Sequence, residues 1–150
     1  MRVGVLSDTH GLLRPRVLTL LEGCDRILHA GDVGGGEILP RLREIAPVEV
    51  VRGNIDSGPE ADELPLSLAG ELDGLPFRMI HRREDLDPSW AKRFRLLVFG
   101  HSHRPELEWR GACLLLNPGS CGPRRFSYPL TLAILTVSEG RIVPEILAVE

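Results

Sequence analysis

The sequence has only three cysteines, no long apolar run and no large net charge. Three cysteines without CxxC spacing argue against a disulfide framework and against a thiolate zinc site. No stretch approaches the roughly 18 apolar residues of a membrane span, and the first ten residues reach polar residues too soon for a signal peptide. The net charge of −3 does not favour binding to nucleic acid. We therefore expect a cytoplasmic protein with no membrane partner.

The length of 150 residues predicts a single domain that covers residues 1–150. A chain of this size can bury roughly 70% of the surface that its unfolded form exposes. With 43% hydrophobic and 26% charged residues, the composition is typical of a globular protein. A packed core therefore needs no disulfides to support it.

The first half of the chain alternates strands with helices. Strands are predicted over 2–6, 26–29 and 48–51, and helices near 13–22 and 37–45. In the second half, Asp73-Gly74 predicts a hairpin, a short helix is predicted over 88–94, and a strand follows over 95–99. Further strand pairs flank Gly111 and 138–140. This pattern predicts an α/β sandwich with parallel and antiparallel strands and with helices outside.

Five apolar runs of the sequence end next to side chains that can bind metals. These side chains are Asp8, His10, Asp32, Asn54, His81, His101 and His103. Buried strands that end alike deliver their last residues to one rim, so these side chains are expected to meet there. Two carboxylates, four imidazoles and one amide suit manganese, iron, zinc, cobalt or nickel, and they are too many for one ion.

Each of these motifs also has a structural explanation. Asp8 is in a position to cap a helix, Gly53-Asn54 is typical of a turn, and a histidine at a strand end often serves structure. His29 lies inside a strand and is predicted to be a core or supporting residue. The motifs together favour a shared metal site. A glycine before a ligand, as at Gly31, Gly53 and Gly100, lets the backbone approach that site closely.

The ordered segments DTHG, GD, GNID and GHSH, with a strand-ending His81 before GHSH, resemble the calcineurin-like metallophosphoesterases. The short chain and the segment NPGS at 117–120 resemble the small phosphodiesterase branch of that family. The resemblance implies an αββα sandwich of two mixed sheets flanked by helices, with the metal site at the C-terminal ends of strands. It also implies two metal positions, one formed by Asp8, His10, Asp32 and His103, and the other by Asp32, Asn54, His81 and His101.

The function implied by the resemblance is hydrolysis of small phosphate esters, diesters in particular, by a hydroxide that bridges two divalent metal ions. Manganese is the expected metal, with nickel, iron, zinc and cobalt as alternatives. Asp32, Asn54 and His81 are the catalytic candidates. The competing interpretation is a non-catalytic scaffold on the same fold, like the retromer scaffold subunit. The substrate, the native metal and homo-oligomer formation stay open.

The segment GNID departs from larger relatives, which carry GNH. Because Ile55 cannot donate a proton, we expect a preference for esters with acidic leaving groups. Asp56 is predicted either to orient a ligand or to form an Asx turn. The Ser120 hydroxyl is predicted to bond backbone near the site rather than to act as a nucleophile. Substrate contact is left open for four arginines, which are Arg82, Arg83, Arg124 and Arg125.

Overall fold

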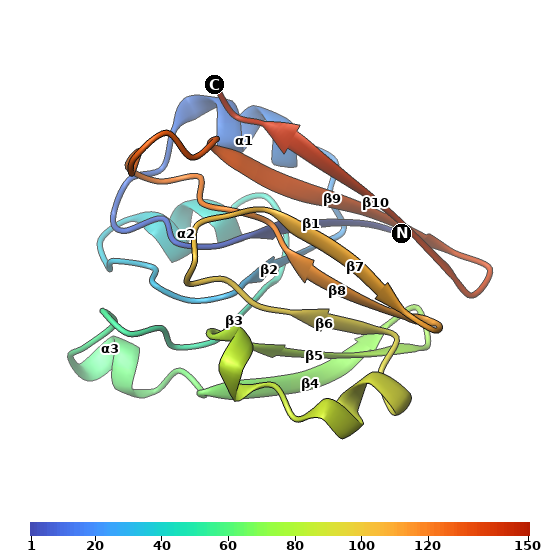
Figure 1. Ribbon diagram of the computed structural model, residues 1–150. Coiled ribbons are helices and arrows are strands. Elements are labelled where there is room, and N and C mark those ends of the chain that lie inside the picture. Colours follow the sequence, from blue (N-terminus) through green and yellow to red (C-terminus); the bar gives the residue numbers. More distant parts are fainter.

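Two five-stranded sheets lie face to face in the computed structural model, which describes residues 1–150 (Figure 1). The first sheet has the order β10-β9-β1-β2-β3. Its strands are β1 (Arg2–Leu6), β2 (Arg26–His29), β3 (Val48–Val50), β9 (Thr131–Ser138) and β10 (Arg141–Ala148). The second sheet has the order β4-β5-β6-β8-β7. Its strands are β4 (Ser67–Leu72), β5 (Leu75–Ile80), β6 (Leu96–Val98), β7 (Glu106–Arg110) and β8 (Cys113–Asn117).

The predicted sandwich of two mixed sheets is confirmed, although the split into a parallel first half and an antiparallel second half is only partly right. In the first sheet β9 and β10 return to pair antiparallel beside β1. In the second sheet β5, β6 and β8 are parallel neighbours. The order of strands in a sheet depends on long-range pairing, which local sequence patterns do not report.

Short helices cover the outer faces of the sheets. They are α1 (Pro15–Leu21), α2 (Ile38–Arg43), α3 (Pro59–Asp62) and the 3₁₀ helices η1 (Arg83–Asp85) and η2 (Pro88–Lys92). Leu21 of α1 and Leu42 of α2 belong to one buried cluster with Ile27 of the first sheet. Trp90 of η2 packs against a buried cluster of the second sheet that contains Leu97 and Leu115. None of these helices combines the length and the apolar character that crossing a membrane requires.

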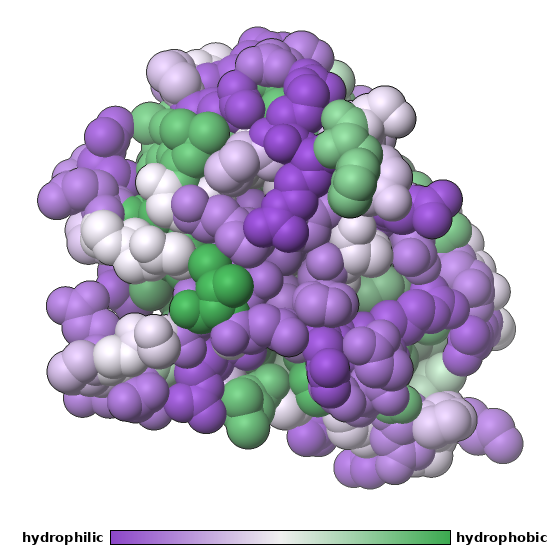
Figure 2. Space-filling model, turned by 60° about the vertical axis from the view of Figure 1, so that its left-hand side comes forward, coloured by the Kyte–Doolittle hydropathy of each residue, from purple (hydrophilic) through white to green (hydrophobic).

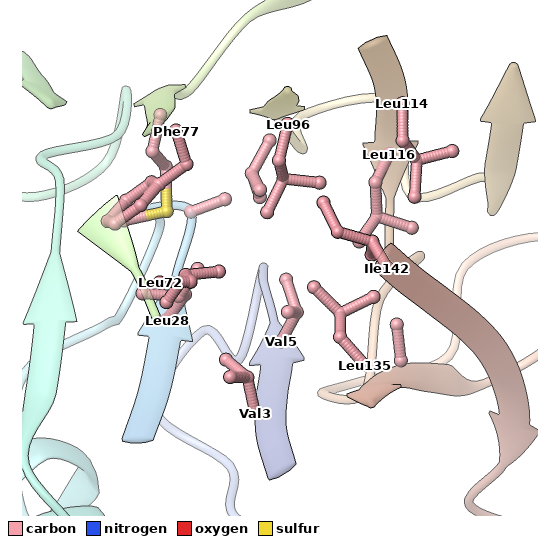
Figure 3. Packing of buried hydrophobic residues seen from close by; sticks show 14 of the residues in the cluster. Val3, Val5, Leu28, Leu72, Phe77, Leu96, Leu114, Leu116, Leu135 and Ile142 are labelled. Atoms are coloured by element: carbon pink, nitrogen blue, oxygen red, sulfur yellow. The ribbon is translucent and has the colours of Figure 1, made fainter. Parts of the chain in front are cut away.

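The main core lies between the two sheets (Figure 3). Val3 and Val5 of β1 point into it, as do Leu114 and Leu116 of β8. Alternate residues of a strand point to the same face, which is why each of these pairs, two residues apart, reaches the same core. Burial of each such side chain stabilises the folded state by about 1.5–3 kcal/mol. The packed core therefore holds the strand ends in fixed relative positions.

The hairpin between β4 and β5 directs the second sheet toward the metal-capable residues. Asp73 and Gly74 have φ values of 50° and 84°, the left-handed pair of a tight hairpin turn, as the sequence predicts. After this turn β5 runs parallel to β6, with Met79 opposite Val98. In the first sheet β1, β2 and β3 are also mutually parallel. The carboxyl ends of five strands can therefore supply one site.

Candidate metal centre

All seven predicted ligands lie just beyond the carboxyl ends of strands. Asp8 and His10 follow β1, and Asp32 follows β2. The others follow β3, β5 and β6, and they are Asn54, His81, His101 and His103. Asp8 and Asp32 are buried, whereas Asn54 and His101 are exposed. The loops thus carry acidic ligands deep in the site and place others at its mouth.

Six of these residues form two compact groups. One group contains Asp8, His10 and His103, and the other contains Asp32, His81 and His101; in each, the possible ligand atoms lie within 4.8 Å of one another. Asp32 Oδ2 lies 3.5 Å from His10 Nε2 and 3.3 Å from His81 Nε2, so one carboxylate oxygen stands between the groups. These two groups contain six of the seven residues to which the sequence resemblance gives two metal positions, and Asn54 is in neither group.

Five of the ligand candidates have left-handed backbone, which is uncommon for residues other than glycine. Their φ values lie between 45° and 72°, at Asp8, His10, Asp32, His101 and His103. Each such residue costs on the order of 1–3 kcal/mol and persists only where the surroundings impose it. These five account for most of the eight left-handed non-glycine residues in the chain, so strain concentrates at this site.

Two glycines show why small residues precede the ligands. A Cβ atom at Gly100 would lie 2.8 Å from Asp8 Oδ2, and one at Gly53 would lie 2.9 Å from Asp32 Cγ. A side chain at either position would therefore push a carboxylate out of the site. The close approach that the sequence predicts for these glycines is confirmed.

Four buried oxygen and nitrogen atoms of side chains at this site have no hydrogen-bond partner. They are Asp8 Oδ1, His10 Nε2, His81 Nε2 and His103 Nδ1. An unsatisfied buried polar atom costs about 1–3 kcal/mol, so four in one place require an explanation. Carboxylate oxygens and imidazole nitrogens are the donors that divalent transition metals accept, and these residues therefore fit metal ions.

The Asp32 carboxylate is held from several sides. Its Oδ1 accepts a hydrogen bond from the Ile55 amide at 3.0 Å. Burial alone would raise the pKa of Asp32, but the interactions with His81 and with the Ile55 amide outweigh it and lower the pKa to about 2. Asp32 is consequently ionised at neutral pH and suits a position between two cations.

His81 is oriented by the backbone. Its Nδ1 lies 2.7 Å from the Ala30 carbonyl oxygen, which can only accept, so Nδ1 carries the proton and Nε2 is free to face Asp32. Burial acts to lower the pKa of His81, but the contacts with Asp32 and Ala30 raise it overall. In His103 burial is the largest influence and lowers the pKa.

His29 supports the site from below, as one of its two predicted roles proposes. Its Nδ1 accepts from the Gly31 amide at 3.1 Å, so the proton of the neutral ring lies on Nε2, which donates to Thr9 Oγ1 at 3.0 Å. Thr9 Oγ1 in turn donates to the Val33 carbonyl at 2.7 Å. Burial lowers the pKa of His29 to about 4, which keeps it neutral. The sequence contained a signal for Thr9, a polar residue between two ligands, but it was missed.

The loops around the ligands are joined by further polar side chains. The Asp56 carboxylate accepts from the amides of Gly53, Val33 and Gly34 at 2.9–3.2 Å, so it both closes its own turn and ties that turn to the loop after Asp32. Ser120 Oγ donates to the Asp8 carbonyl at 3.1 Å, which confirms its predicted structural role.

Asn117 is a supporting residue for which the sequence suggests no role. Its Nδ2 donates to the Gly100 carbonyl at 3.2 Å and to Ser102 Oγ at 3.1 Å, and its Oδ1 accepts from the Gly119 amide at 2.9 Å. It therefore holds the loop that carries His101 and His103. A polar residue buried at the end of the apolar strand β8 is the signal that could have indicated this role.

The four arginines lie in different surroundings. Arg82 lines a cavity with Asn54 and His81. Arg83 instead makes ion pairs with Glu106 and Glu108. Arg124 pairs with Glu150 at 2.6 Å, and the charge of Arg125 acts to lower the pKa of His103. Figure 2 shows the face that Figure 1 presents on its left, where polar side chains predominate and isolated apolar ones interrupt them.

Comparison with known proteins identifies the family. The model of the calcineurin-like phosphoesterase superfamily domain matches residues 1–140. A protein of Methanothermobacter thermautotrophicus named a probable metallophosphoesterase is 31% identical over 160 residues, covering 98% of this chain and 92% of that protein.

Solved structures share the fold at lower identity. An archaeal phosphodiesterase has a TM-score of 0.78 and 21% identity, covering 98% of this chain and all of that one. Vps29 of Entamoeba histolytica, solved with Zn²⁺, has a TM-score of 0.76 and 22% identity over the full length of both chains. The family model and the sequence relative together show that this chain belongs to the calcineurin-like phosphoesterase superfamily.

Proposed function

We propose that this protein is a metal-dependent phosphodiesterase with two divalent metal ions, manganese being the expected one. The observation that carries the proposal is the pair of ligand groups with Asp32 between them. Asp8, His10, Asp32 and His103 would hold one ion, and Asp32, Asn54, His81 and His101 the other. Two such ions would lower the pKa of bound water and polarise the phosphoryl oxygens of an ester.

The residues of the chain set the conditions for this reaction. Ionised Asp32 would neutralise part of the charge of the two metal ions, and the Ile55 amide keeps its Oδ1 in place. The exposed Asn54 amide is able to donate a hydrogen bond to a phosphoryl oxygen on which negative charge accumulates. Ile55 is 46% exposed and presents no acid to the leaving group. Diesters with acidic leaving groups are therefore the favoured substrates.

Reconstitution with single metals tests the proposal. Protein freed of metal with a chelator is loaded separately with Mn, Ni, Zn, Fe or Co and given bis(p-nitrophenyl) phosphate and p-nitrophenyl phosphate. We expect hydrolysis to return with at least one metal and to be faster with the diester. Asp32→Asn should reduce the rate by at least about 100-fold, the range in which electrostatic contributions to catalysis fall.

A matched control uses the same chemical change away from the site. Asp73→Asn alters the turn between β4 and β5, where Asn-Gly is as favourable as Asp-Gly, and it should keep the wild-type rate. The alternative function is a protein-interaction scaffold, for which the Vps29 fold is the precedent. If no metal restores hydrolysis of either ester and Asp32→Asn changes nothing, the scaffold becomes the better explanation.

A further inference from the structure

A cavity of about 430 Å³ opens directly beside the ligand groups. Asn54 and His81 form part of its wall, so a phosphate at the metal site would lie at its edge. The rest of the lining is formed by Arg52, Gly53, Leu66, Ile80, Arg82 and Asp85. Its volume lies within the roughly 300–1,000 Å³ of small-molecule sites.

Two arginines in this lining have hydrogen-bonding capacity to spare. A guanidinium group carries five N–H donors. Arg52 uses its side chain for one contact, to Asp62 at 3.5 Å. Arg82 uses Nε and Nη2 for Asp85 at 3.1 and 3.4 Å, and the same Nε lies 3.5 Å from Glu84 Oε1. Asp85 thus holds Arg82 at the cavity while several donors of both arginines stay available. A carboxylate or phosphate matches the planar fork of such a group.

Arg83 offers a built-in contrast. Its two terminal nitrogens pair with Glu106 and Glu108 at 2.6 and 3.2 Å, and its guanidinium lies 5.3 Å from the ring centre of Phe99. It is next to Arg82 in sequence but lines a different cavity, which contains no predicted ligand. Arg83 therefore serves the packing of the second sheet.

The Arg52 and Arg82 cavity differs in the charge of its lining from the cavity between α2 and α3. That cavity has a volume of about 400 Å³, and its charged lining consists of Asp56, Glu60 and Glu63 against Arg43. Three carboxylates there would repel an anion. The lining of the Arg52 and Arg82 cavity instead contains two guanidinium groups and one carboxylate, that of Asp85, while Asp62 and Glu84 pair with the arginines from outside the lining. Leu66, which is 61% exposed, adds an apolar wall for a carbon chain.

We propose that the Arg52 and Arg82 cavity binds a second oxyanion, a carboxylate or a phosphate, carried by the part of the substrate that is linked to the reacting phosphate. The preferred substrates are then small phosphodiesters in which a short carbon chain links the reacting phosphate to a second anionic group. This inference rests on the proposed function, because it places the reacting phosphate at the ligand groups.

The test compares ligands that differ only in the second anion. Glycerol 3-phosphate, 3-phosphoglycerate and glycerol 1,3-bisphosphate have the same three-carbon chain and end in a hydroxyl, a carboxylate and a phosphate respectively. Their affinities for the manganese-loaded protein are measured by calorimetry and as inhibition of bis(p-nitrophenyl) phosphate hydrolysis. We expect at least one of the two ligands with a second anionic group to bind about tenfold more tightly than glycerol 3-phosphate, which corresponds to one charge-assisted hydrogen bond.

Variants test whether the preference for a second anionic group arises in the Arg52 and Arg82 cavity. Arg82→Ala and Arg52→Ala should each remove most of it, whereas the matched control Arg83→Ala should retain it. Equal affinities of all three ligands for the wild type, or a loss of preference in Arg83→Ala as large as in Arg82→Ala, would overturn the inference. If the protein hydrolyses no ester, the proposed function fails separately, and calorimetry with the same ligands still decides whether the cavity binds an oxyanion.

Discussion

Replacing Thr9 by valine tests whether the residues beneath the ligands determine the position of the ligands. The hydroxyl of Thr9 accepts a hydrogen bond from His29 and donates one to the Val33 carbonyl. Valine has nearly the same shape but lacks the hydroxyl, so both partners lose their bond while they remain buried. At about 1–3 kcal/mol for each of the two groups left unsatisfied, Thr9→Val should lower the free energy of unfolding by about 2–6 kcal/mol.

Thr9→Ser is the matched control because it keeps the hydroxyl and removes one methyl group, a loss of about 1 kcal/mol. Thr9 lies between Asp8 and His10, so a shift of its backbone also moves two ligand candidates. We expect Thr9→Val to weaken manganese binding by about tenfold, the lower end of the effect that supporting residues have on metal sites. Thr9→Ser should bind manganese like the wild type.

Two measurements are needed for this pair of variants. Urea unfolding of the manganese-loaded proteins gives the free energies of unfolding, and titration followed by the electron paramagnetic resonance of free Mn²⁺ gives the affinities. Equal metal affinity in Thr9→Val and Thr9→Ser would refute the idea that the Thr9 hydroxyl positions the ligands. Equal stability of the two variants would refute the hydrogen-bond assignment itself.

Two further predictions concern Ile55 and His29. Rates for a series of aryl diesters should fall by about 100-fold as the leaving-group pKa rises from about 7 to 10, because Ile55 provides no acid; a flat series would contradict this. Burial lowers the pKa of His29 from 6.5 to about 4, so the stability gained from the neutral ring is fully present above about pH 6.5 and is lost as the pH falls toward 4. The difference in unfolding free energy between wild type and His29→Asn should therefore narrow over that interval, and a constant difference would argue against a neutral His29.

The strands of the first sheet could be read from local sequence, and some helices could not. β1 and β2 have the predicted limits because each is a short apolar run bounded by turn residues. α1 begins at Pro15 rather than at residue 13, since proline suits only the first turn of a helix. α3 was not predicted, as four polar and small residues show no helical period. The helix predicted over 88–94 is the 3₁₀ helix Pro88–Lys92.

The ligand candidates were more predictable than their surroundings. Metal-capable side chains at strand ends are visible in the sequence because the strand itself is local. The contacts that hold them are not, since Thr9 meets Val33 and Asn117 meets Gly100 across loops far apart in the chain. The contrast between Arg82 and Arg83 has the same origin: adjacent residues turn to different neighbours, and only the folded chain specifies which.

The enzyme and the scaffold interpretations make different demands on the surface beside the ligands. Strained ligand loops, and buried oxygen and nitrogen atoms without hydrogen-bond partners, are expected of any protein on this fold that holds metal ions. They therefore support both interpretations equally. Guanidinium donors without partners at the edge of the site are different, because a metal that serves only structure needs no anion next to it. Arg52 and Arg82 line the cavity that Asn54 and His81 border, which is where the rest of a bound ester would extend. This placement favours a phosphoesterase over the scaffold.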